Sequence, residues 1–229
     1  MTLDGGGPML HVTGLRKSFP TPAGPHLVLD GVDLTVALGE VIAIGGRSGS
    51  GKTTLLTIIA GWEELDDGSV VFDDTIVPAA PRTWRDLAIV PQALGLLDEL
   101  SIAENLALPL RLASDAPADD PFEMMARLGI DHLADRYPDE VSLGEQQRAA
   151  LGRAAVIEPA LLLADELLAH QNREWAETMM LVVGLLAAKG TACVLATHDE
   201  IAFERAHRVL ELRSGRLVPL VPDEHGRSQ

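Results

Sequence analysis

The chain has 229 residues, of which 47% are apolar but only 3% aromatic, so leucine, valine, isoleucine and alanine must fill its core. This length suits one large domain, or one domain with a subdomain. The formal net charge of −16 disfavours a nucleic-acid groove, which needs a basic face, and it disfavours direct docking on anionic lipid.

Cysteine content and hydropathy further narrow the class of protein that this chain can belong to. Cys193 is the single cysteine and lies in an apolar run, which argues against a disulfide framework or a metal cluster and indicates a reducing, cytoplasmic compartment. No apolar run reaches the length of about 18 residues that a membrane-spanning helix needs. The first residues lack the charged and apolar parts of a signal peptide.

The beginning of the chain is predicted to form short strands. Residues 1–7 are expected to be flexible, and the alternating pattern over 10–15 predicts an edge strand. A loop rich in proline and glycine is expected over 20–25. Two further strands are predicted over 27–29 and 32–36, and the Asp-Gly pair between them indicates a hairpin turn.

The stretch from Gly45 to Leu56 reads Gly-Gly-Arg-Ser-Gly-Ser-Gly-Lys-Thr-Thr-Leu-Leu and fits the phosphate-loop pattern G-x-x-x-x-G-K-[ST] over residues 46–53. The apolar run over 41–44 suits a buried strand before the loop, and residues 53–60 suit a helix after it. This strand, turn and helix are the context that the motif requires. Taken alone, the pattern could also be a glycine-rich turn that binds nothing.

A phosphate loop implies a triphosphate and a divalent cation as ligands. Glycines let backbone N–H groups point at phosphates, and the start of the following helix adds the positive end of its dipole. We expect Lys52 to reach the β- and γ-phosphates of ATP and the Thr53 hydroxyl to ligate Mg²⁺. The expected nucleotide-binding residues of this stretch are Gly46, Arg47, Ser48, Gly49, Ser50, Gly51, Lys52, Thr53 and Thr54.

The middle of the chain turns from strands to helices. Strands are predicted over 69–72 and 87–90, and a helical pattern then extends from about 93 to 157. Its leucine-rich part is expected to break at Pro109. The helices predicted in this region cover 104–112, 121–128, 130–136 and 142–157.

Strands and helices alternate again after the helical region, which implies a parallel sheet with crossover helices. We therefore predict an α/β fold: a P-loop NTPase core with a mixed, mainly parallel sheet, an N-terminal antiparallel β subdomain and an inserted α-helical subdomain. One domain is predicted over 8–221, with its core and β subdomain in 8–92 and 158–221, its helical subdomain in 93–157, and flexible ends at 1–7 and 222–229.

Polar residues that follow apolar strands are the candidates for catalysis. Asp165 and Glu166 end the strand Leu-Leu-Leu-Ala, where the carboxyl end of a parallel strand meets the phosphate loop. We expect Asp165 to hold Mg²⁺ through water and Glu166 to act as general base on the attacking water. Without the phosphate loop, a solvated acidic turn would be the preferred interpretation.

Two further side chains follow strands. The Gln92 amide could contact Mg²⁺ and the attacking water, and it could sense the γ-phosphate. The His198 imidazole could hydrogen-bond the γ-phosphate and hold the water in line. The alternatives are a surface glutamine and a structural histidine.

Together these motifs resemble the nucleotide-binding subunits of ABC transporters in order and spacing. The resemblance covers about residues 8–220 and rests on the phosphate loop, Gln92, Tyr137-Pro-Asp-Glu-Val-Ser-Leu-Gly-Glu-Gln-Gln-Arg148, Leu-Leu-Leu-Ala-Asp-Glu166 and Ala-Thr-His198. It implies that Phe19 stacks on adenine. It also implies that the signature segment, with Ser142, Gly144 and Glu145, crosses a dimer interface to contact nucleotide held by the other subunit.

Two departures from the family pattern concern that interface. The family's Leu-Ser-Gly-Gly-Gln stands here as Val-Ser-Leu-Gly-Glu, so Leu143 adds a Cβ and Glu145 a charge near the expected phosphate. Ser142 and Glu145 also have the spacing of a helix capping box, which can coexist with a phosphate contact. After Glu166 the family continues Pro-Thr-x-x-Leu-Asp, whereas here Asn172 replaces the interface aspartate.

The resemblance implies an ATP-binding and hydrolysing subunit that dimerises around ATP and Mg²⁺ and drives an integral-membrane permease from the cytoplasmic face. The second ATP-binding subunit is either a copy of this chain or a paralogue. The stretch Glu104–Leu110 resembles macrolide-export, lipoprotein-release and division-associated subunits. Alternatives are a hydrolysis-impaired regulatory subunit, a soluble ABC ATPase acting on DNA or ribosomes, and a small-molecule kinase, which would not explain residues 137–148. We expect no nucleic-acid partner.

Overall fold

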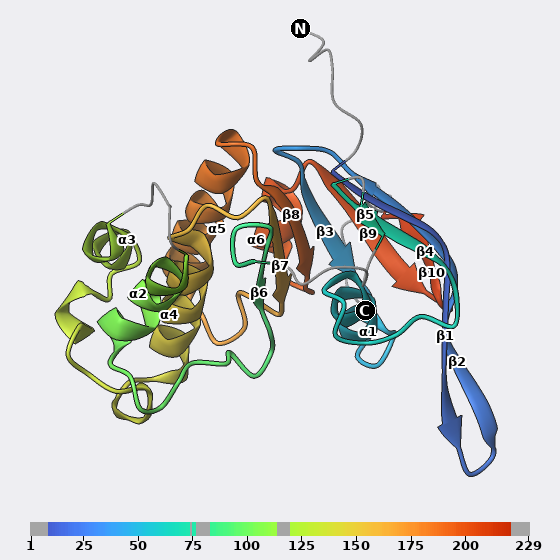
Figure 1. Cartoon of the computed structure of the whole chain (residues 1–229), viewed down its shortest axis with the longest axis horizontal. Helices are drawn as coiled ribbons and strands as arrows, with labels where there is room; N and C mark the ends of the chain where they lie inside the picture. The colour runs from blue at the N-terminus through green and yellow to red at the C-terminus, as the bar shows by residue number, and fades with distance from the viewer. Residues whose placement is uncertain (1–8, 74, 77–82, 114–119, 221–229) are drawn as a thin grey trace, which may run out of the picture.

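The computed structural model describes residues 9–73, 75–76, 83–113 and 120–220. Its strands form two sheets (Figure 1): a larger one in the order β10-β9-β3-β8-β7-β6, and a smaller one in the order β2-β1-β4-β5. In Figure 1 the helices α2, α3 and α4 gather at one end of the molecule, and the long β1–β2 hairpin extends at the opposite end.

The larger sheet is parallel from β9 to β6, and β10 pairs antiparallel with β9. Its strands are β3 (Val41–Gly45), β6 (Leu87–Val90), β7 (Leu161–Asp165), β8 (Ala192–Ala196), β9 (Arg208–Arg213) and β10 (Arg216–Pro219). Apolar runs form these strands because both faces of the sheet are covered. Leu161 and Leu163 pack with α1 and the smaller sheet, while Leu162 and Ala164 pack with the helices on the other face. The predicted mixed, mainly parallel sheet is therefore confirmed.

The smaller sheet is antiparallel, as predicted, but the predicted hairpin inside it is wrong. Its strands are β1 (Leu10–Thr21), β2 (Gly24–Val36), β4 (Asp67–Phe72) and β5 (Thr75–Ile76). Asp30 and Gly31 lie within β2, where the pairing register with β1 shifts and Gly31 has a φ of 77°. The Asp-Gly pair thus forms a β-bulge rather than a turn. The turn follows Thr21, inside the segment expected to be a loop.

The helices occupy the two regions that the sequence assigned to them. Those of the core are α1 (Lys52–Ile59), α5 (Arg173–Ala188) and α6 (Glu200–Arg205). Those between β6 and β7 are α2 (Ile102–Leu112), α3 (Pro121–Arg127) and α4 (Leu143–Ala155), with two 3₁₀ turns, η1 (Asp131–Leu133) and η2 (Pro138–Glu140). The predicted insertion of a helical subdomain into the α/β fold is confirmed, while its exact limits at 93 and 157 stay a prediction.

Two predictions in the helical region are wrong. Pro109 lies inside α2 and does not break it, because the helix packs on α4 so closely that a Cβ at Gly152 would meet Leu106 at 2.8 Å. Tertiary packing of this kind offsets the hydrogen bond that proline cannot donate. The helix predicted over 130–136 is only the short turn η1, since α3 ends at Arg127 and Gly129 adopts a φ of 64°.

Several composition-based expectations can be compared with the described residues. Cys193 is a free, fully buried thiol, and burial raises its pKa to about 12. Among the described helices, none is long and apolar enough to cross a membrane. The ends predicted to be flexible, 1–7 and 222–229, lie outside the described residues.

Candidate active site

The phosphate loop connects β3 to α1, as the sequence predicts, and its backbone demands glycine at two close approaches. Gly46 has a φ of 141°, and a Cβ there would lie 2.7 Å from the Leu212 carbonyl oxygen. Gly51 has a φ of 104°, and a Cβ there would lie 2.7 Å from Val28. No side chain caps the first N–H groups of α1, so they stay available to an anion.

Lys52 is the first residue of α1 and is only 8% exposed. Its ammonium donates to the carbonyl oxygens of Gly46 at 2.8 Å and Arg47 at 3.4 Å. It also lies 3.9 Å from Glu166 Oε1. The positive charge is therefore held at the mouth of the loop, where it can turn from carbonyl to phosphate oxygens.

Two oxygen donors meet where α1 and β7 approach each other. The Thr53 hydroxyl donates to Asp165 Oδ2 at 2.6 Å. Asp165 is the last residue of β7 and is buried. A hydroxyl and a carboxylate are hard oxygen ligands of the type that Mg²⁺ prefers, so this pair suits that cation. Among the described residues, no group of three or more histidine, cysteine or acidic side chains forms a metal cluster.

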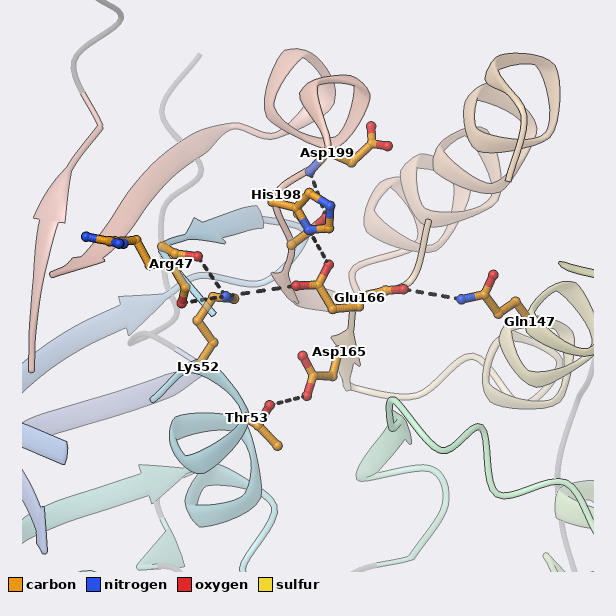
Figure 2. Close-up of polar contacts among 10 residues, drawn as sticks. Arg47, Lys52, Thr53, Gln147, Asp165, Glu166, His198 and Asp199 are labelled. Carbon is orange, nitrogen blue, oxygen red and sulfur yellow. Dashed lines mark hydrogen bonds and ion pairs between the residues drawn. The ribbon is translucent and has the colours of Figure 1, made fainter. Parts of the chain in front are cut away.

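Glu166 is the residue on which polar contacts from Lys52, His198 and Gln147 converge (Figure 2). It adopts a left-handed backbone with a φ of 52°, and its N–H donates to the Ala196 carbonyl at the end of β8. One carboxylate oxygen faces Lys52, and the other accepts from Nδ1 of His198 at 2.8 Å. The carboxylate is thus fixed between a cation and an imidazole whose side chain is 76% exposed. A non-glycine residue in this conformation is strained, which is common at functional sites.

These groups face an open cavity of about 1000 Å³. The predicted residues that line it are Phe19, Gly46, Arg47, Ser48, Gly49, Ser50, Gly51, Lys52, Thr53, Thr54, Gln92, Asp165, Glu166 and His198. His26, Val28 and Gln147 line it too, although the sequence did not single them out. His26 could have been found from the register of β1 and β2, because it pairs directly with Phe19.

Ser142, Gly144 and Glu145 do not line the cavity, although their neighbour Leu143 does. Ser142 caps α4 in the predicted capping box: its N–H and hydroxyl donate to Glu145 Oε2 at 2.8 and 2.7 Å. These hydrogen bonds, the side-chain one first, hold the pKa of Glu145 below its ordinary value. The serine hydroxyl is therefore already engaged within its own helix turn.

Asn172 also serves as a helix cap. Its side-chain oxygen accepts from the Trp175 N–H at 2.9 Å, at the start of α5. Gln147 and Gln171, which the sequence did not indicate, lie beside this turn and hydrogen-bond each other at 3.0 Å. No local pattern could have revealed them, since their partners are distant in sequence.

The arrangement can be compared with known proteins. Residues 29–169 match the family model described as ABC transporter. The chain belongs to this family. It is 40% identical over 220 residues to the lipoprotein-releasing system ATP-binding protein LolD of Bordetella avium, covering 92% of this chain and 96% of that protein. It is 35% identical over 220 residues to the macrolide export ATP-binding/permease protein MacB 1 of Aeromonas hydrophila, covering 92% of this chain but 34% of that protein.

Solved structures agree with the family assignment. The ATP-binding cassette MJ0796, in a dimeric post-hydrolysis state bound to ADP and Pi, superposes with a TM-score of 0.83 at 26% identity, covering 91% of this chain and 96% of that one. This chain is therefore an ATP-binding, ATP-hydrolysing cassette of an ABC transporter. The fold class, the ATPase activity and the resemblance to lipoprotein-release and macrolide-export subunits are confirmed.

Proposed function

We propose that this ABC cassette hydrolyses ATP with Glu166 as general base, in a site that a second cassette completes. The observation that carries the proposal is the position of the Glu166 carboxylate, 3.9 Å from Lys52 Nζ and 2.8 Å from His198 Nδ1. Thr53 and Asp165 lie beside it on α1 and β7. All five side chains line one cavity.

Nucleotide binding is assigned to the phosphate loop and Phe19. The N–H groups of the loop and the Lys52 ammonium neutralise phosphate charge. Phe19 presents a ring from β1 for stacking on the base, with Lys17 Nζ 5.0 Å from its centroid. The buried Lys17 is itself paired with Glu63 at 2.6 Å, so its charge is balanced without the nucleotide.

The Thr53 hydroxyl, the Asp165 carboxylate and the Gln92 amide would hold Mg²⁺, with Asp165 acting through water. When bound, the cation supplies neutralisation of the charge on the phosphate oxygens. The Thr53–Asp165 hydrogen bond of 2.6 Å supports this assignment, because it brings two suitable oxygens together before any ion binds.

Hydrolysis is assigned to Glu166 and His198. The Glu166 carboxylate accepts a proton from the attacking water. His198 Nδ1 donates to that carboxylate and orients it, and in the imidazolium form the other ring nitrogen also donates, to the γ-phosphate. Gln92 lines the same cavity and can contact the water from the side of the helical region.

The partners are a second ATP-binding subunit, identical or paralogous, and an integral-membrane permease at whose cytoplasmic face this chain works. The dimeric MJ0796 structures and the combined ATP-binding/permease protein MacB support this assignment. The net charge of −16 suits a permease with basic cytoplasmic segments and disfavours a nucleic-acid partner.

The test is Glu166→Gln, assayed for phosphate release and for binding of a fluorescent ATP analogue. Loss of a general base lowers turnover by about 10²–10⁴-fold, while nucleotide affinity stays within about threefold. Glu177→Gln, which removes an ion pair with Arg173 within α5 and lies outside the cavity, serves as the matched control and keeps full turnover. Unchanged turnover in Glu166→Gln would remove this residue from the mechanism.

A second candidate is a regulatory subunit that binds ATP but hydrolyses it poorly. It is favoured by the engagement of the Ser142 hydroxyl with Glu145 and of Asn172 with the Trp175 N–H. Turnover of the purified chain, alone and with a co-purified permease, separates the two: the regulatory subunit stays slow in both preparations.

A further inference from the structure

Gln171 lies in the segment between β7 and α5 and makes three side-chain hydrogen bonds. Its Nε2 donates to the Gly144 carbonyl at 2.8 Å and to Gln147 Oε1 at 3.0 Å. Its Oε1 accepts from Arg148 Nη1 at 3.3 Å. A leucine at this position could make none of these bonds.

The orientation of this amide is fixed by its partners. A backbone carbonyl such as that of Gly144 can only accept, and the Arg148 guanidinium can only donate. Nε2 must therefore face Gly144 and Oε1 must face Arg148. This orientation makes Gln147 present its own oxygen to Gln171, and its Nε2 then donates to the Glu166 carbonyl at 3.4 Å.

The hydrogen bonds connect two places that serve different nucleotides in the proposed dimer. Gly144 belongs to the first turn of α4, beside Ser142, whereas Glu166 is the proposed base for this chain's own ATP. The two segments are already in contact, since a Cβ on Gly144 would lie 3.2 Å from the His170 carbonyl oxygen. Gln147, itself on α4, contacts the Glu166 carbonyl, and Gln171 links Gly144 to Gln147 and fixes the orientation of the Gln147 amide.

Arg148 donates a hydrogen bond to the oxygen of the Gln171 amide. It is 6% exposed, its guanidinium stacks 4.1 Å from the centre of the Trp175 ring, and burial lowers its pKa. Its buried Nε has no hydrogen-bond partner within the described part of the chain. Gln171 thus supplies a needed acceptor to a desolvated cation, which ties the amide firmly to α4 and α5.

We propose that Gln171 is a positioning residue that couples the Ser142 turn of α4 to Glu166. The inference rests on the proposed function, because it takes Glu166 as the base and the Ser142 turn as the surface offered to the second cassette. When the partner's nucleotide engages that turn, the displacement reaches Glu166 through Gly144, Gln171 and Gln147. Each site of the dimer then responds to occupancy of the other.

The test compares Gln171→Leu and Gln171→Glu with Gln146→Leu. Gln171→Leu removes all three bonds, and Gln171→Glu keeps only the contact with Arg148. Gln146 is the matched control, since its amide donates to the Pro138 and Val141 carbonyls from the same helical turn without reaching Glu166. The ATP dependence of phosphate release gives the maximal turnover and the Hill coefficient, and an ATP analogue gives the affinity.

Both Gln171 variants are expected to lose about tenfold in maximal turnover, as loss of a bond to a charged or buried group predicts, with a Hill coefficient near 1 and unchanged affinity. Gln146→Leu lowers the melting temperature but keeps the wild-type Hill coefficient. Wild-type turnover and Hill coefficient in both Gln171 variants would overturn the inference, as would an equal loss in Gln146→Leu.

Hydrogen exchange of the full chain provides a readout that does not need hydrolysis. In Gln171→Leu, exchange rises by about threefold or more in both 143–148 and 166–172, whereas in Gln146→Leu it rises only around 137–146. If the wild type hydrolyses no ATP, the proposed function fails, and this measurement still decides whether Gln171 joins the two segments. Unchanged exchange in 166–172 would overturn the coupling.

Discussion

The two halves of the proposed ATP site in this cassette are built differently. The inner half consists of the phosphate loop and the ends of β7 and β8, and its polar groups pair with one another: Lys52 with Glu166, Thr53 with Asp165. The outer half consists of the first turn of α4 and residues 167–172. Two of its polar side chains serve in helix caps, with Ser142 bound to Glu145 and Asn172 bound to the Trp175 N–H.

The difference indicates which half of the site can bind nucleotide without a second cassette. Contacts among groups of the inner half can be exchanged for phosphate and cation without unfolding any element. Engaging phosphate with the Ser142 hydroxyl costs the capping bond, which is worth about 1 kcal/mol. The inner half is therefore ready to bind a nucleotide, while the outer half depends on what a second cassette offers in return.

The largest effect is expected from Lys52→Ala, which tests the inner half. Removing an ammonium that pairs with phosphate costs about 1.5–3 kcal/mol, or about 10–100-fold in affinity for ATP. Lys189→Ala, a surface lysine paired with Glu158, is the control and keeps wild-type affinity. Titration with a fluorescent ATP analogue measures both. Equal affinities would mean that the loop does not hold the phosphates.

Leu143→Gly with Asn172→Asp tests the outer half by restoring two family residues. If Leu143 obstructs the approach to phosphate, turnover rises by about tenfold, the equivalent of one lost hydrogen bond regained. Leu97→Gly is a control of similar exposure, 43% against 46% for Leu143, and lies outside the cavity. Phosphate release is compared after correction for the folded fraction. Unchanged turnover in the double variant would show that Leu143 and Asn172 do not limit hydrolysis.

Gly129→Ala tests whether the outer half depends on Trp175. A Cβ at Gly129, where φ is 64°, would come 2.0 Å from the Trp175 ring and push it off Arg148. Overpacking of this kind costs about 2 kcal/mol, which corresponds to about 4–8 °C in melting temperature. Gly184→Ala is the opposite control, because its Cβ meets nothing within 4 Å and alanine favours the helix. A thermal melt that ranks the two variants in reverse would contradict the packing argument.

The smallest effect concerns the pH dependence of the α4 cap. Hydrogen bonds from Ser142 keep the pKa of Glu145 below its ordinary value of 4.5, so they stabilise the fold above that pH and are lost as pH falls through the lowered pKa. Glu145→Gln should therefore melt about 1–3 °C below wild type at pH 7, with the gap closing as the pH falls below 4.5 and through the lowered pKa. In a Ser142→Ala background the pH-dependent gap should shrink without vanishing, because the N–H of residue 142 still donates to Glu145 Oε2.

The inner half could be predicted from the sequence because each of its parts is a local pattern. Gly46–Thr53 fixes a turn between a strand and a helix, and Asp165-Glu166 ends an apolar strand. Parallel strands bring such ends to one edge of the sheet, which is where Asp165, Glu166 and His198 lie. Their roles in catalysis stay proposals until the variants are measured.

The wrong predictions rest on local sequence patterns whose outcome depends on tertiary structure. An Asp-Gly pair suits a tight turn or a bulge, and only the pairing of β2 with β1 decides that Gly31 forms a bulge. Pro109 stays helical because α2 is pressed against α4. Gln171 carries no local signature, since its hydrogen-bond partners Gly144 and Gln147 lie 27 and 24 residues earlier in the chain.

The placement of Phe19 near the tip of the β1–β2 hairpin has a consequence for nucleotide specificity. A stacked ring senses the area of a nucleobase and not the donors and acceptors along its edge. His26, which pairs with Phe19 across β1 and β2, and Val28 line the same cavity, and neither side chain carries a carboxylate or amide to tell a 6-amino from a 6-oxo purine. GTP and inosine triphosphate should therefore drive this cassette nearly as well as ATP.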